Sequence, residues 1–138
     1  MNAKEYLSQA RYLDARINAK IKQVESLNAL ATSATSALTG MPHNPNKATS
    51  KMADIVAKIV DLQDEINHDI DTLVDLKSEI AEVIKAIPDV EQQTILEQRY
   101  LCFMPWEKIA VELQFTPRHI FRLHDEALKK IRIPESCQ

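Results

Sequence analysis

Residues 106–123 read WEKIAVELQFTPRHIFRL, and this stretch predicts two short helices joined by a tight turn. The apolar face of the first helix consists of Ile109, Ala110 and Leu113. Thr116 is a favourable N-cap for the second helix, and Pro117 suits its first turn. Two short helices at this spacing form a helix-turn-helix, a unit that can set its second helix in the major groove of DNA.

The helix-turn-helix belongs to a predicted three-helix domain over residues 89–133. Its last helix is expected to run from Thr116 to Ile131 and to bury Ile120, Leu123, Ala127 and Ile131. Another helix is predicted over about Val90–Leu101. The residues of that helix expected to face inward are Val90, Thr94, Ile95, Gln98 and Leu101. Met104 and Pro105 make the turn that leads into residue 106.

Two long helices are predicted before this domain, one over about Ala3–Leu38 and one over about Lys51–Ile87. At 1.5 Å per residue the second would be about 55 Å long. The apolar stripe of the first consists of Tyr6, Ala10, Leu13, Ile17, Ile21, Val24, Leu27, Ala31, Ala34 and Leu38. The stripe of the second consists of Met52, Ile55, Ile59, Leu62, Ile66, Ile70, Leu73, Leu76 or Lys77, Ile80, Ile84 and Ile87.

The break between the long helices is predicted at residues 39–50, because Gly40, Pro42 and Pro45 do not favour a continuous helix. Thr49 or Ser50 would cap the next helix. Two striped helices joined by a short loop can pack as an antiparallel hairpin. The expected fold class is therefore all-α: a long helical hairpin over residues 1–88, the three-helix domain, and a polar tail over 134–138.

Such a hairpin makes a thin core, which leaves two arrangements open. A second copy of the chain can complete it as a four-helix bundle or coiled coil, giving a homodimer. Alternatively, the hairpin of a monomer packs on its own carboxy-terminal domain. The long acidic face over residues 54–82 is either solvated or a docking face for a basic partner such as RNA polymerase.

Charge is distributed unevenly along a chain whose formal net charge is −3. Residues 51–88 carry four Lys/Arg against nine Asp/Glu, whereas residues 116–132 carry five against two. A locally basic helix on an acidic protein fits a domain that touches DNA through one face. The single glycine excludes glycine-rich phosphate loops, and no nucleophile, paired-carboxylate or metal-ligand pattern stands out. We expect neither an enzyme nor a cofactor.

The remaining sequence features concern cysteines and location. Cys102, in an apolar stretch, is expected to be a buried small hydrophobe, and Cys137 an inert tail thiol, rather than a disulfide pair. No segment approaches the roughly 18 apolar residues of a membrane span, and the first residues contain no apolar signal segment. We expect a cytosolic protein without a membrane partner.

Residues 89–132 resemble region 4 of bacterial sigma factors of the sigma-70 class. The residues that carry the likeness are Gln98-Arg99-Tyr100, the stretch 106–113, Thr116, Ile120, Leu123 and the terminal string Ala127-Leu128-x-Lys130-Ile131-Arg132. The regions of a sigma factor that bind the −10 element are absent, and a long hairpin precedes the domain instead. That combination is similar to phage late-gene transcription regulators of the ArpU and RinA type.

The resemblance implies a transcription regulator that reads double-stranded DNA with residues 116–132, with RNA polymerase as a further partner. The DNA-binding positions would be Lys108, Thr116, Pro117, Arg118, His119, Phe121, Arg122 and Lys129. Physically, Arg118 and Arg122 lie one turn apart and can each contact a guanine bidentately. Lys108 and the helix amino termini can hold phosphates, and Phe121 can meet a thymine methyl group.

The chain departs from the region 4 pattern at the turn and at the reading positions. The family usually has glycine after the first helix, where this chain has Gln114. Pro117 and Phe121 stand where polar or basic residues are common, so we do not expect the ordinary promoter sequence to be read. The alternative function is an adaptor whose domain binds polymerase or another protein without reading DNA. Trp106, Phe103 and Phe115 are expected to pack in the core.

Overall fold

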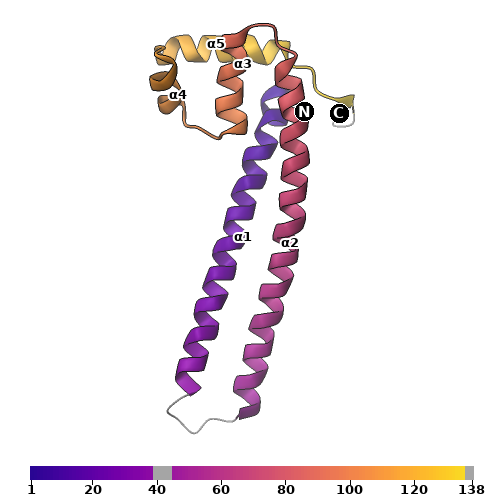
Figure 1. Ribbon diagram of the computed structural model, residues 1–138, viewed down its shortest axis with the longest axis vertical. Coiled ribbons are helices and arrows are strands. Elements are labelled where there is room, and N and C mark those ends of the chain that lie inside the picture. The colour runs from indigo at the N-terminus through magenta and orange to yellow at the C-terminus, as the bar shows by residue number, and fades with distance from the viewer. Residues whose placement is uncertain (39–44, 136–138) are drawn as a thin grey trace. The chain divides into compact units, whose positions relative to one another are not determined.

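The computed structural model describes residues 1–38 and 45–135 (Figure 1). For residues 34–38 and 45–49 it describes the backbone alone. The fold is all-α, as predicted: a long antiparallel pair of helices is followed by a small cluster of three. The elements are α1 (Ala3–Leu38), α2 (Pro45–Lys85), α3 (Val90–Leu96), a π-helical segment η1 (Glu97–Leu101), α4 (Trp106–Leu113) and α5 (Pro117–Lys130). The chain forms two compact units, one over residues 15–71 and one that combines residues 1–14 with 72–138.

The 15–71 unit is a segment of the antiparallel pair in which most described stripe residues are half-buried, whereas Ile17 is buried and Ile21 and Ile70 are exposed. An ion pair interrupts the apolar contact: Lys20 Nζ lies 2.6 Å from Asp69 Oδ2 and 3.6 Å from Glu65 Oε2. The hydrogen bond from Lys20 lowers the pKa of Asp69 below its ordinary value. This bond gives Asp69 a structural role that the sequence-based interpretation of a solvated acidic face did not include.

Three predictions for this part of the chain are wrong. Ile21 was expected in the stripe of α1, but it is 39% exposed. Ile70 was expected in the stripe of α2, but it is exposed because Asp69 takes the inward position beside Lys20. A loop was expected through Ser50, but α2 begins at Pro45. Proline is well suited to a first helical turn, where its missing N–H would have no intrahelical partner. Residues 39–44 of the predicted loop lie outside the described residues.

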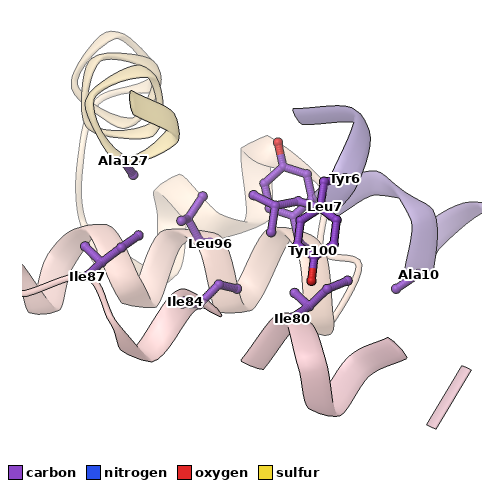
Figure 2. Packing of buried hydrophobic residues seen from close by; sticks show 9 residues of the cluster. All are labelled: Tyr6, Leu7, Ala10, Ile80, Ile84, Ile87, Leu96, Tyr100 and Ala127. Atoms are coloured by element: carbon purple, nitrogen blue, oxygen red, sulfur yellow. The ribbon is translucent and has the colours of Figure 1, made fainter. Parts of the chain in front are cut away.

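The second unit has a compact core, to which distant parts of the chain contribute (Figure 2). Its buried members are Tyr6, Leu7, Ala10, Ile80, Ile84, Ile87, Leu96, Tyr100 and Ala127. The first three lie on α1, the next two lie on α2, Ile87 follows the end of α2, and the three-helix domain supplies the rest. The amino-terminal turns of α1 therefore support the domain that contains the helix-turn-helix.

The segment Val90–Leu101 differs from the predicted helix in its helix type and in which residues it buries. It is α-helical only to Leu96, and the π-helical turn that follows is closed by the bond from Cys102 N to Glu97 O, 3.1 Å. The buried positions are Gln92, Ile95, Leu96 and Tyr100, whereas Val90 is 72% exposed. Cys102 is exposed rather than buried because it lies just past the last π-helical residue. Cys137 lies outside the described residues.

Candidate nucleic-acid interface

The turn between α4 and α5 has the geometry expected of a helix-turn-helix. Gln114 adopts the left-handed conformation, with φ 59°, at the position where the resemblance predicted a strained backbone. Phe115 N donates to Ala110 O at 3.1 Å and closes the end of α4. Thr116 then caps α5, since its Oγ1 accepts from His119 N at 3.2 Å, and Pro117 occupies the first turn.

A second apolar cluster fixes the two helices against each other. Its buried members are Ile95, Ile109, Ala110, Ile120 and Leu123, and Met104, Trp106, Leu113 and Phe115 pack around them. The predicted buried residues of α4 and α5 therefore lie inward, although Leu113 is only half-buried; Ile131, just past the end of α5, is half-buried as well. Phe115 and Trp106 pack against this core, as expected.

The amino-terminal half of α5 presents a basic, hollowed surface. Arg118 and Arg122 are exposed, and a shallow hollow is lined by Thr116, Arg118, His119 and Arg122. His119 Nδ1 lies 2.8 Å from Arg122 Nη2 and accepts its hydrogen bond, while the imidazole ring meets Phe115 edge-on at 4.8 Å. This contact restricts Arg122 before any ligand is bound. The structure thus brings together four of the residues predicted to bind DNA.

Phe121 and Pro117 add apolar surface beside this hollow. Phe121 is 46% exposed, and its ring meets that of Trp106 at 5.3 Å between centroids. The guanidinium of Arg99 lies 4.6 Å from the centre of the Trp106 ring and donates to Met104 O at 3.1 Å. The sequence-based assignment did not include Arg99 in this surface, because its place follows from the π-helical turn.

Lys108 and Lys129 lie apart from the hollow. Lys108 is exposed in the first turn of α4, and Lys129 is exposed near the end of α5. Lys129 follows Arg118 by eleven residues, which places it on the same face of α5 about 16 Å further along.

The side of α5 away from this surface contains a buried polar pair that sequence reasoning missed. Tyr100 Oη and His124 Nε2 are 2.6 Å apart in the interior. Burial raises the pKa of Tyr100 to about 12 and lowers the pKa of His124 to about 4. Near neutral pH the phenol therefore donates to an uncharged imidazole. The available signal was spacing, since position 124 falls between Ile120 and Ala127 on the buried stripe.

Gln92 makes a second polar link between α3 and α5. It is 3% exposed, its Oε1 accepts from Lys130 Nζ at 2.9 Å, and its Nε2 donates to Glu126 Oε2 at 3.3 Å. Lys130 therefore has a structural contact, unlike Lys129 beside it. These bonds hold α5 in a fixed orientation on α3.

The chain belongs to the family described as a protein of unknown function (DUF1492), whose match covers residues 45–132. The match runs without a break from α2 through α5. Comparisons with curated proteins and with solved structures gave no match. Among the described residues, no helix is long and apolar enough to span a membrane, and no three potential metal-ligating side chains gather together.

Proposed function

We propose that this protein is a sequence-specific DNA-binding transcription regulator that reads double-stranded DNA with the first half of α5. The observation that carries the proposal is the exposed pair Arg118 and Arg122 beside the Thr116 cap, on a helix whose other side is locked in the core. A helix with one fixed side and one basic side suits insertion into the major groove. The likeness to sigma region 4, and to phage regulators of the ArpU and RinA type, supports the same proposal.

Two classes of contact follow from the positions of the side chains. Arg118 and Arg122 would read base edges, Phe121 would meet a thymine methyl group, and His119 would orient Arg122. Lys108, Lys129 and the amino terminus of α5 would hold phosphates. RNA polymerase is a further expected partner, and we expect a homodimer on a site with two half-sites.

The test is genome-wide footprinting with the source genome, followed by affinity measurement on the sites found. Replacing both Arg118 and Arg122 with Ala should abolish specific footprints, since each good arginine–guanine pair contributes about 1–3 kcal/mol of discrimination. Far-ultraviolet circular dichroism should be unchanged because both side chains are exposed. Footprints that persist unchanged in this double variant would refute the assignment of the reading helix.

A matched control separates base reading from loss of charge. Lys22 and Lys58 are exposed lysines of the 15–71 unit, and replacing both with Ala removes the same two charges. This variant should keep the footprints of the parent protein. In the parent, log affinity should fall steeply with log salt concentration, with a slope near −0.9 for each phosphate contacted.

A protein-binding adaptor is the second candidate, and the exposed ring of Phe121 favours it. An aromatic side chain that is 46% exposed beside Trp106 is a common feature of protein-binding surfaces. In that case binding would depend on Phe121 and only weakly on salt, and no DNA sequence would be selected. A Phe121→Ala variant that loses polymerase binding but keeps its footprints would assign Phe121 to the protein partner.

A further inference from the structure

Helix α2 carries a second row of apolar positions, separate from the stripe along α1. Val56, Val60 and Ile70 are 49%, 48% and 41% exposed. With the exposed amides Gln63 and Asn67 they follow the alternating steps of four and three of a coiled-coil heptad. We call these five residues the α2 seam.

The α2 seam is placed as a second helix neighbour requires. Each of its residues directly follows a position of the half-buried stripe, namely Ile55, Ile59, Leu62, Ile66 and Asp69. One residue corresponds to about 100° around an α-helix. Two faces at nearly a right angle are what a helix presents when it has two neighbours in a four-helix bundle. Exposed apolar rows of this kind mark interaction sites.

We propose that the α2 seam pairs antiparallel with the α2 seam of a second copy of this chain, so that two hairpins complete a four-helix bundle. In an up-and-down bundle adjacent helices run antiparallel, and here α1 already runs antiparallel to α2. This dimer extends the proposed DNA-binding function, since a two-fold protein fits two half-sites, but it can be tested without DNA.

The order of residues in the α2 seam indicates that its partner is a second copy of the chain. The pattern is symmetric about position 65: Val60 mirrors Ile70, and Gln63 mirrors Asn67. An antiparallel two-fold pair therefore sets Val60 of each copy against Ile70 of the other, on both sides of the centre. The two amide side chains meet at the centre, where they can bond to each other and fix the register.

The acidic border of the seam gives this dimer an unusual salt dependence. Asp64 and Asp71 are exposed on the side of the seam away from the stripe. Near the two-fold axis, Asp64 of each copy approaches that of the other, and salt screens the resulting repulsion. The dimer should therefore tighten as salt rises, whereas binding to DNA weakens.

The size of the seam limits the strength of the pair. From position 56 to 70 the helix extends about 21 Å. A contact one helix wide over that length buries less than the roughly 800 Å² per partner of a standard interface. We therefore expect a reversible dimer with a dissociation constant on the order of micromolar.

The test is sedimentation equilibrium of the full chain without DNA, across about a 100-fold range of concentration at low and high salt. The parent should be a reversible dimer that tightens with salt, and Val60→Glu or Ile70→Glu should weaken it at least about tenfold. Leu30→Glu is the control, because Leu30 is 57% exposed in the same unit but lies outside the seam. A monomer at every concentration, or equal effects of all three variants, would overturn the proposal. The proposal would also be overturned if the chain stayed monomeric and its seam bound a basic partner protein with an affinity that falls as salt rises.

Orientation is tested by cysteine cross-linking in a background with Cys102 and Cys137 replaced by Ser. A mixture of Val60→Cys and Ile70→Cys chains should form a mixed disulfide, while neither variant should cross-link by itself. Cross-linking of Val60→Cys chains alone would overturn the antiparallel register. The Arg118→Ala/Arg122→Ala variant should dimerise normally, so failure of DNA binding and failure of dimerisation are told apart.

Discussion

The two compact units use the same long helices but differ in how completely they enclose side chains. In the unit of residues 1–14 and 72–138, Leu7, Ile84, Ile95 and Ile109 are fully buried. Among the described side chains of residues 15–71, only Ile17 is buried, and Ile21, Leu30, Val56, Val60 and Ile70 are exposed. Two helices can cover a side chain on one side only, whereas crossing helices enclose it. The unit of residues 1–14 and 72–138, called the carboxy-terminal unit below, therefore encloses its core, whereas the 15–71 unit leaves several apolar side chains exposed.

The largest expected difference concerns core truncation in the two units. Ile84→Ala should lower the free energy of unfolding by about 3 kcal/mol, because it leaves a cavity in an enclosed core. Ile59→Ala removes the same atoms from a half-buried site and should cost about 1 kcal/mol. Urea denaturation followed by circular dichroism measures both. Equal losses would show that the 15–71 unit is enclosed in solution, as it would be in a tight dimer.

Acid should weaken the carboxy-terminal unit through His124. Its pKa is about 4 in the folded protein and about 6.5 when unfolded, so between these values only the unfolded chain takes up the proton. Stability should therefore fall as pH drops from about 6.5 to about 4, by up to about 3 kcal/mol. Trp106 fluorescence during denaturation reports this unit. In His124→Gln, the free energy of unfolding should change less with pH in this range. If it changes as much as in the parent, another group causes the pH dependence.

In the 15–71 unit, the ion pair of Lys20 and Asp69 should behave as a coupled pair. Asp69→Leu leaves the Lys20 ammonium without its closest partner and should lower the melting temperature. The double variant Lys20→Met/Asp69→Leu should recover that loss, because apolar side chains then meet across the helices. Because its folded pKa is lowered, Asp69 contributes stability above its ordinary pKa and loses it as pH falls through the lowered value. A double variant as unstable as the single one would contradict this coupling.

The smallest expected effect is at the turn of the helix-turn-helix. Gln114→Gly should stabilise the protein by about 0.5–1 kcal/mol, because glycine accepts φ 59° without steric cost. Gln114→Val should destabilise it, since a β-branched residue disfavours that conformation. Thermal denaturation of the three proteins measures both changes. If Gly lowers the melting temperature, the side chain of Gln114 has a stabilising contact that its backbone does not reveal.

Local patterns predicted most elements of the fold and the outline of the candidate site. The helix over Ala3–Leu38, the helix over Trp106–Leu113 and the Thr116 cap follow from periodicity and capping, which act between near neighbours. The same signals place Arg118 and Arg122 on one exposed face of α5. These features depend on a few consecutive residues, and so they could be read from the sequence. The special backbone of Gln114 was implied by the resemblance to region 4.

The remaining features depend on residues that are far apart in the chain. Asp69 displaces Ile70 from the interior because Lys20 lies opposite, 49 positions earlier. The bond from Tyr100 to His124, the Gln92 link to Lys130 and the place of Arg99 over Trp106 likewise need partners brought together by folding. The sequence by itself determined the helices and the basic face of α5. Only the tertiary structure decided which polar groups are buried together and which apolar row stays exposed, because burial is set by the neighbours that folding supplies.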